Sequence, residues 1–522
     1  MSFEAKHPRL QAVPGDACMP SRRLLSRGPL AAMLALAGLC PFLAAAASAQ
    51  TQAPSRVREP AVAGLFYPKD PAELSKMIDA CLAAARVQPV GELKALICPH
   101  AGYPYSGPVA AYGYKLLAGR HYDTVVVMGP SHYADVRAGS VANATLYRTP
   151  LGDVPVSAKA GRLALARPFE LEPPCPVQRP DWWLESSRRA PAVDTAETWE
   201  HSVEVEVPFL QRTLGRFELV PVVCGEIDPE RAAKALEPFL DERTLVVASS
   251  DLSHYYTYDR ARQLDRACVD AICRLDIGAM EGQEACGRIP ILILMHVAKD
   301  RGWRPRLLDS RNSGDTAGDK SRVVGYAAVA FYAPFGQHLA PAGRQSLLAI
   351  ARGALRGAVG AGGRTDAPGP VPGLEEPRGC FVTLTEHGEL RGCIGNLVAR
   401  GPLYSQVAEN ARSAALDDPR FSAVTAGEEA TLKIEISVLT EPQQLFFSSP
   451  DDLLQKLQPG VDGVILKIGD RMATYLPQVW EQMPDKTAFL DSLAEKAGCG
   501  ASDWRKPGTA VFLYEVESFK EP

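Results

Sequence analysis

The most informative segment of the chain is ICPHAGYPYSG, which spans residues 97–107. An apolar run ends within it, and a histidine follows at once in a turn rich in glycine and proline. Two later segments repeat this arrangement, since Thr124–Met128 leads to His132 and Thr244–Ala248 leads to His254. Short β-branched runs bounded by Gly, Pro and Ser are typical of buried strands. Their continuous hydrophobicity predicts a parallel sheet that is covered on both faces.

Open α/β sheets bind ligands beyond the carboxyl ends of their strands. We therefore expect His100, His132 and His254 to lie at one edge of one sheet. Helix-like segments alternate with the strands, as they do in right-handed βαβ units. The sequence thus predicts an α/β fold with a mostly parallel, helix-flanked sheet and a metal or catalytic site built from strand-end histidines.

The composition is that of a globular protein with more than one domain. The chain has 522 residues, of which 46% are apolar and 22% are charged, and this length favours two or three domains. A net charge of -5 gives no reason to expect a nucleic-acid partner. Twelve cysteines are scattered without a CxxC motif, so neither a zinc ribbon nor a thioredoxin-type site is indicated.

Residues 1–50 read as a secretory signal peptide. Arg22 and Arg23 precede an apolar run from Pro29 to Leu43, and an A-x-A exit ends at Ala49. The run is too short for a membrane span, and the paired arginines resemble a twin-arginine signal. We expect export to the periplasm and no membrane span in the mature chain, with a cytoplasmic location as the alternative.

Composition shifts divide the remainder of the chain. We predict a first domain over residues 51–335, a linker with a leading helix over 336–378, and a second domain over 379–522. In the first domain the segment 168–198 is predicted as a long surface loop. The segment 199–210 fits both the period of a strand and that of a helix, and the sequence leaves this choice open.

The second domain is predicted to be α+β. Hairpin signals surround the turns at His387-Gly388 and Gly469-Asp470. Helices are expected over residues 403–415 and from Asp485, a suitable N-cap, to Ala497.

A thiol can join the strand-end histidines. Cys286 stands directly before Gly287 and an apolar helix, whose N-terminus would stabilise a thiolate. Two imidazoles and a thiolate suit iron, copper or zinc and suit magnesium or calcium poorly. Asp251 could orient an imidazole or act as a base. The alternative for Cys286 is a small buried apolar residue.

The first domain contains six motifs in order, namely PAVAGLFYP (60–68), PHAGY (99–103), GPSH (129–132), EHS (200–202), SSDLSH (249–254) and CGR (286–288). Together they resemble the motif set of the Memo family. Memo proteins are similar in fold to the class III extradiol dioxygenases, which are non-haem Fe(II) enzymes. The resemblance implies that His100, His132 and Cys286 are metal ligands, with Asp251 and His254 as catalytic candidates in the same pocket. His201 matches a family motif without an assigned role.

The resemblance also limits the expected reaction. Extradiol dioxygenases hold iron with two histidines and a glutamate, whereas the third ligand here would be a cysteine. A thiolate changes the potential and the preference of the metal, so ring cleavage is not expected to follow from the fold. A redox role and a copper-handling role are equally compatible, and iron or copper is favoured over zinc.

The second domain resembles the AMMECR family through LRGCIG (390–395), DPRF (418–421) and ATYLPQVW (473–480). Memo-like and AMMECR-like domains on one chain look like the A and B components of the AmmeMemoRadiSam group, whose third component is a radical SAM protein. The resemblance implies such a partner. Arg391 and Cys393 could form a small anion or thiol site, or the glycines beside them could set a tight corner with Cys393 in the core.

Three classes of function follow from these patterns. The first is a metal-dependent redox protein of the Memo type, an oxidoreductase if it is an enzyme. The second is a binding or adaptor protein that uses the same pocket for a peptide or small molecule. The third is a metal-assisted hydrolase in which Asp251 or His254 activates water.

Overall fold

The computed structural model describes residues 56–87, 92–185, 192–333, 339–361 and 373–522. The predicted signal peptide, residues 1–50, lies outside these ranges. No helix within them combines the length and the apolar character needed to cross a membrane.

Four parallel strands form the centre of a nine-stranded sheet in the first domain. In spatial order they are β2 (Glu92–Cys98), β9 (Thr244–Ser249), β3 (Thr124–Pro130) and β8 (Glu218–Cys224). Every residue of β3 and β9 is buried, which agrees with the continuous apolar runs of the sequence. The predicted parallel sheet is thus confirmed at its centre.

Antiparallel pairing completes this sheet on both sides. Strand β12 (Val323–Ala333) pairs with β2. It also pairs with β10 (His254–Tyr256) and with β11 (Arg304–Asn312). On the other side β4 (Gly139–Val141) pairs antiparallel with β8 and parallel with β7 (Phe169–Leu171).

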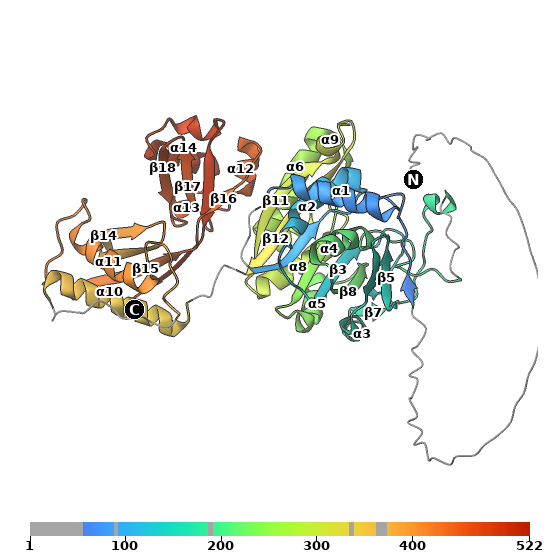
Figure 1. Ribbon diagram of the computed structural model, residues 1–522, viewed down its shortest axis with the longest axis horizontal. Coiled ribbons are helices and arrows are strands. Elements are labelled where there is room, and N and C mark those ends of the chain that lie inside the picture. Colours follow the sequence, from blue (N-terminus) through green and yellow to red (C-terminus); the bar gives the residue numbers. More distant parts are fainter. Residues whose placement is uncertain (1–55, 88–91, 186–191, 334–338, 362–372) are drawn as a thin grey trace, which may run out of the picture. The chain divides into compact units, whose positions relative to one another are not determined.

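Helices cover both faces of the sheet (Figure 1). One face packs on α1 (Pro71–Ala84), α2 (Tyr103–Lys115) and α4 (Val207–Leu214). The other face packs on α5 (Pro229–Leu236), α6 (Tyr258–Cys273) and α8 (Arg288–Asp300). Neighbouring residues of β2 serve the two cores, since Leu96 belongs to the first and Ile97 to the second.

Smaller elements complete the first domain. Strands β1 (Val57–Arg58), β5 (Leu146–Thr149) and β6 (Gly152–Pro155) form a three-stranded sheet. Short helices are α3 (Ala158–Leu163), α7 (Ile277–Glu281) and α9 (Ser313–Thr316).

Two uncertain segments of the first domain now have a structure. The segment 199–210 is helical, because a 3₁₀ turn at Glu204–Glu206 runs into α4. The described parts of the predicted loop 168–198, residues 168–185 and 192–198, contain β7 and a 3₁₀ turn at Asp181–Glu185.

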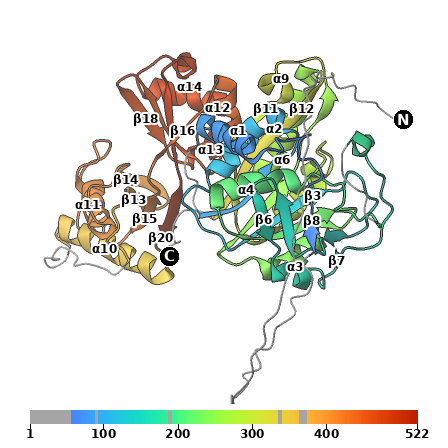
Figure 2. The same ribbon diagram turned by 45° about the vertical axis from the view of Figure 1, so that its right-hand side comes forward.

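The second domain consists of two four-stranded antiparallel sheets. The first has the order β14 (Glu389–Asn396), β13 (Cys380–Glu386), β15 (Leu432–Leu439) and β20 (Val516–Lys520). Helices α10 (Pro341–Val359) and α11 (Leu403–Leu416) pack on it (Figure 2).

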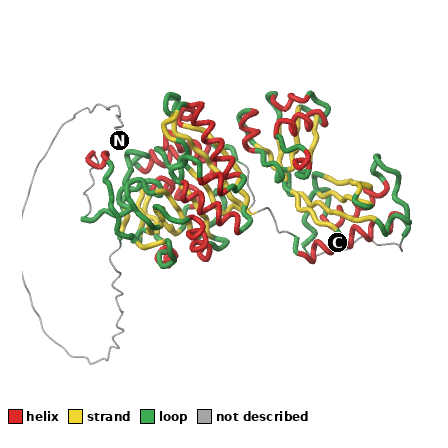
Figure 3. The backbone as a smooth tube through the Cα atoms, turned by 180° about the vertical axis from the view of Figure 1, so that it is seen from behind, coloured by secondary structure: helices red, strands yellow, loops and turns green. Residues whose placement is uncertain are grey.

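The other sheet has the order β16 (Gln443–Leu445), β19 (Ala510–Tyr514), β17 (Gly463–Ile468) and β18 (Arg471–Tyr475). Its core includes residues of α12 (Pro450–Lys456), α13 (Val479–Gln482) and α14 (Lys486–Lys496). Figure 3 shows strands in yellow and helices in red for each sheet.

The local signals of this domain are confirmed. His387 and Gly388 both have positive φ, 52° and 90°, as a tight hairpin turn requires. The Asp485 side chain accepts a hydrogen bond from the Ala488 amide and caps α14.

Candidate metal centre

Three parallel strands deliver the predicted site residues to one edge of the nine-stranded sheet. His100 follows β2, His132 follows β3, and Asp251 follows β9 between them. Parallel strands end at the same edge, so the order of the strands brings these side chains together.

His100 is buried and held at both its backbone and its ring. Its amide donates to Asp251 Oδ1 at 2.9 Å. Its ring Nδ1 lies 2.7 Å from Ser249 Oγ, and its Nε2 lies 3.3 Å from Cys286 Sγ. The ring is therefore fixed on one side, and Nε2 faces the thiol.

His132 is held by the buried carboxylate of Glu200. The amide of His132 donates to Glu200 Oε2 at 2.6 Å, and its Nδ1 lies 2.8 Å from Glu200 Oε1. The ring stacks on His201 with centroids 4.5 Å apart, and the His132 side chain is 25% exposed. Since Glu200 occupies Nδ1, Nε2 is the nitrogen left for a ligand.

Cys286 stands at the start of α8, as predicted. The Asp251 amide lies 3.2 Å from Cys286 Sγ, and the Gly287 amide donates to Ser250 Oγ at 3.0 Å. A Cβ on Gly287 would lie 2.4 Å from the Ser249 carbonyl oxygen. Glycine at this position lets the chain pass close enough to the end of β9 for the thiol to reach the histidines.

The ligand atoms of His100, His132 and Cys286 all lie within 4.8 Å of one another. An overlapping group of His132, Glu200 and His201 meets the same distance. Glu200 is less suited to metal binding, however, because the amides of His201 and Ser202 also donate to its Oε1, at 2.8 and 2.9 Å. In the first group the Asp251 amide donates to Cys286 Sγ at 3.2 Å, and the thiol contacts both imidazoles, so the three donor atoms face one another.

The pKa values of the three imidazoles differ because of burial and neighbouring charges. Burial alone would lower the pKa of His132, but the Glu200 carboxylate and the Cys286 sulfur outweigh it and hold that pKa well above its ordinary value. Burial and the charge of His132 lower the pKa of His201 to about 3. Burial, with His132 and His201 nearby, also holds the pKa of His100 well below its ordinary value.

Burial also shifts the pKa values of the acidic groups at this site. Burial raises the pKa of the Cys286 thiol, against the opposing effect of His132. Burial also raises the pKa of Asp251 to about 7, although the amides of His100 and Ala101 donate to its carboxylate. A cation between the rings and the thiol would favour the thiolate, since metal binding to cysteine and histidine displaces protons.

The two predicted catalytic candidates take different places. Asp251 is buried and supports the backbone of His100 through Oδ1. His254 begins β10 and is near enough to His100 for its charge to lower the pKa of His100. Their catalytic roles stay predictions.

Sequence reasoning missed Glu200 and Glu204, both from the segment whose structure it left open. Glu204 is fully buried and accepts hydrogen bonds from the Ala61 amide at 2.6 Å and the Tyr67 hydroxyl at 2.5 Å. It also pairs with Arg58. Carboxylates at alternate positions among valines were the available signal, because buried acids need partners.

These contacts hold the motif at residues 60–68 in place. Glu204 holds this segment, and the Phe66 ring lies 4.6 Å from that of His201. The Tyr103 amide donates to the Phe66 carbonyl oxygen at 2.8 Å. The segment therefore lies beside the histidine cluster and supplies an apolar wall next to it.

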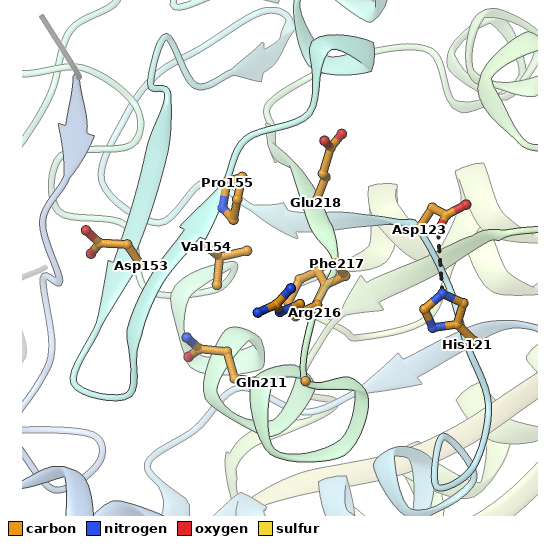
Figure 4. A pocket seen from close by; sticks show the side chains of 10 residues that line it. His121, Asp123, Asp153, Val154, Pro155, Gln211, Arg216, Phe217 and Glu218 are labelled. Carbon is orange, nitrogen blue, oxygen red and sulfur yellow. Dashed lines mark ion pairs between the residues drawn. The ribbon is translucent and has the colours of Figure 1, made fainter.

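A separate hollow of about 650 Å³ includes residues from the opposite edge of the sheet. Figure 4 shows Asp123, just before β3, and Glu218, at the start of β8, with Arg216 and the His121–Asp123 ion pair. His121 and Asp123 are 3.7 Å apart and both well exposed. This hollow lacks the converging buried donors of the histidine cluster, which remains the stronger candidate.

Two family models match separate parts of the chain. Residues 58–330 match the family model described as Memo-like protein, and residues 348–519 match AMMECR1. A MEMO1 family protein of Methanosarcina acetivorans is 37% identical over 290 residues, which cover 52% of this chain and 98% of that protein. One of Aquifex aeolicus is 35% identical over 289 residues, covering 53% and 99%.

One solved structure is also similar, that of an uncharacterized protein from Pyrococcus horikoshii. It shares 34% sequence identity, and the match covers 34% of this chain and 89% of that chain with a TM-score of 0.32.

Proposed function

The chain belongs to the Memo family through residues 58–330, and on this premise we propose that it is a metal-dependent redox protein. In this proposal iron or copper is held by His100 Nε2, His132 Nε2 and Cys286 Sγ. Asp251 and His254 line the same site and are the groups that could exchange protons with a bound molecule.

The convergence of three donors carries the proposal. The ligand atoms lie within 4.8 Å of one another, although they come from three separate parts of the chain. Each imidazole has its Nδ1 engaged by a second residue, Ser249 or Glu200. Such outer partners are typical of metal-binding histidines, because they fix the ring and the tautomer.

The donor set decides which metals to consider. Two imidazoles and a thiolate favour copper and iron, as well as zinc, over hard cations. A bound iron or copper ion would supply one-electron redox chemistry at this edge of the sheet. The protein would orient the ligands and limit access from one side, since His100 is buried, whereas Cys286 is half-buried and the His132 side chain is 25% exposed.

Ring cleavage is not part of the proposal. The carboxylate that could replace Cys286 in a two-histidine, one-carboxylate set is Glu200, and its oxygens are engaged by His132, His201 and Ser202. A thiolate ligand supports electron transfer or metal handling instead.

Elemental analysis of the purified full-length protein tests the proposal. We expect stoichiometric iron or copper in the wild type and its loss in the His100→Ala, His132→Ala double variant. His121→Ala is the matched control, because His121 lies outside the cluster and is well exposed. Metal retained by the double variant would refute the proposal, and bound zinc with ester or amide turnover would support the hydrolase alternative.

For the second domain, the likeness to AMMECR proteins supports a proposed link to a radical SAM partner. The motif resemblance of both domains to components of the AmmeMemoRadiSam group is the basis of this step. Anaerobic co-purification with a radical SAM protein encoded in the same genome is the expected result, and absence of any association at micromolar concentrations would count against it.

We also propose export to the periplasm, on the basis of the n-region, apolar run and A-x-A exit of residues 1–50. N-terminal sequencing of the mature protein should give Gln50 or a residue near it. An intact Met1 on protein from the cytoplasmic fraction would contradict export.

A further inference from the structure

A chain of buried hydrogen bonds leads from His100 away from the candidate metal position. Ser249 Oγ lies 2.7 Å from His100 Nδ1, 2.6 Å from the Ser202 carbonyl oxygen and 2.6 Å from Glu206 Oε1. Ser249 and Glu206 are both buried, with exposed fractions of 0% and 1%. One hydroxyl therefore has three close polar partners.

Because this hydroxyl has a single proton, the donor in each of its hydrogen bonds can be assigned. A serine hydroxyl has one proton to donate and two positions at which it can accept. The Ser202 carbonyl oxygen can only accept, so the proton of Ser249 must point to it. The remaining two partners must then donate, which requires a proton on His100 Nδ1 and a proton on Glu206 Oε1.

Other arrangements leave a close pair of oxygens without a proton between them. An ionised Glu206 would take the Ser249 proton and leave the Ser202 carbonyl 2.6 Å from an oxygen that cannot donate to it. Such an unpaired buried contact costs free energy. The geometry alone therefore favours a neutral Glu206.

The other oxygen of Glu206 fits this assignment. Tyr114 Oη donates to Glu206 Oε2 at 2.5 Å, so Oε2 accepts while Oε1 carries the proton. Burial, the largest influence, raises the pKa of Glu206 to about 8, against the hydrogen bonds from Ser249 and Tyr114. The buried environment of Glu206 therefore also favours its neutral form.

We propose that Glu206 is a protonated positioning residue that acts through Ser249 to hold His100 with its proton on Nδ1 and its lone pair on Nε2. Nε2 then faces Cys286 Sγ, 3.3 Å away. The part that concerns a metal rests on the proposed function, whereas the tautomer and the neutral carboxyl are properties of the metal-free protein.

The Nδ1 atoms of the two histidines thus have partners of different charge. His132 Nδ1 contacts the carboxylate of Glu200, whereas His100 Nδ1 contacts a neutral hydroxyl backed by a neutral acid. An anionic partner raises the basicity of an imidazole ligand more than a neutral one does. We therefore expect His132 to be the stronger electron donor of the two.

Nuclear magnetic resonance of metal-free, ¹⁵N-histidine-labelled full-length protein tests the tautomer. We expect His100 to carry its proton on Nδ1 in the wild type. Ser249→Ala removes the acceptor and Glu206→Ala removes the support behind it, so both should lose the single Nδ1–H form. Glu206→Gln should keep it, because an amide N–H can donate to Ser249 while its oxygen accepts from Tyr114.

Infrared difference spectroscopy tests the proton on Glu206 independently. A carboxylic-acid carbonyl band present at neutral pH should disappear in Glu206→Gln. Glu197→Gln is the matched control, because Glu197 is another buried acid of the same domain whose pKa burial raises to about 8. That variant should remove a different acid band and leave the His100 tautomer unchanged.

Metal affinity gives a third readout. Glu206→Ala should weaken iron or copper binding by roughly 10- to 100-fold, the usual effect of losing an outer partner, and Glu206→Gln should restore it. A proton on His100 Nε2 in the metal-free wild type, or no acid band lost in Glu206→Gln, would overturn the inference. If no metal binds but the tautomer and the band are as expected, the proposed function fails and this inference stands.

Discussion

Cys286 and Cys393 each stand beside a glycine, and their surroundings differ. Cys286 precedes Gly287 at the end of the parallel sheet, and Cys393 follows Gly392 within β14 of the second domain. Both glycines are required by close packing, since an added Cβ would lie 2.4 Å from Ser249 O in the first case and 2.1 Å from a carbonyl oxygen of α11 in the second.

The difference lies in what converges on the sulfur. Cys286 Sγ is 3.3 Å from His100 Nε2, with His132 within reach. Cys393 Sγ lies 3.3 Å from the Thr383 hydroxyl, and the neighbouring Arg391 is paired with Glu428 at 2.9 Å. The second arrangement favours the packing interpretation over an anion site. A cysteine beside a glycine is thus no signal until other donors meet it.

Replacing Cys286 or Cys393 with serine should give the largest difference in metal binding between the two sites. Cys286→Ser should weaken iron or copper binding by more than about 100-fold, beyond the effect of losing an outer partner. Cys393→Ser should leave metal content unchanged. Metal stoichiometry of both variants measures this, and equal loss in the two would remove the distinction between the sites.

Removing the carboxylates beside each site gives the next effect. Glu200→Gln should weaken metal binding by roughly 10- to 100-fold. It should also lower the pKa of His132, because the carboxylate that opposes burial is gone. Glu428→Gln is the control, since Glu428 contacts Arg391 and Thr425 in the second domain. Isothermal titration of metal and the titration of His132 by magnetic resonance report both quantities.

The pH dependence of metal binding follows from the same groups. Glu200 raises the pKa of His132, and burial raises that of Cys286, so protons compete with the metal at both ligands. Affinity should therefore fall as pH is lowered from alkaline to acidic values, with release of protons on binding. The decline should be shallower in Glu200→Gln, and pH-independent binding in the wild type would exclude these ligands.

Substitution of Gly287 and Gly392 separates an effect on stability from an effect on metal binding. Gly287→Ala and Gly392→Ala should each lower the free energy of unfolding by about 1–3 kcal/mol, as overpacking does. Only Gly287→Ala should also weaken metal binding, because it displaces the chain next to Cys286. Chemical denaturation together with metal titration separates the two, and unchanged metal affinity in Gly287→Ala would mean that the thiol tolerates the shift.

The smallest effect concerns the pair in the second domain. Arg391 and Glu428 are partly exposed, with side-chain exposures of 14% and 26%. Breaking such a pair in Glu428→Gln should cost no more than about 1 kcal/mol. Thermal unfolding measures it, and a much larger loss would show that the hydrogen bonds from Thr425 to Glu428 contribute to stability as well.

Much of the fold could be predicted because its signals are local. The apolar runs of β3 and β9 and the turn at His387-Gly388 depend on a few neighbouring residues. The segment 199–210 could not be assigned, because its valines and acids fit two periods equally well. Partners far away in sequence permit a buried helical turn there, because Arg58 pairs with Glu204 and Tyr67 donates a hydrogen bond to it.

By itself the sequence determined where the strands end and therefore which histidines meet at one edge, because parallel strands align their carboxyl ends. Only the tertiary structure decided how those histidines are held. Glu200 reaches His132 across 68 residues of sequence, and Ser249 connects His100 with Glu206. Hydrogen bonds of this kind depend on ångström-scale distances between remote segments, which periodicity and motif spacing do not encode.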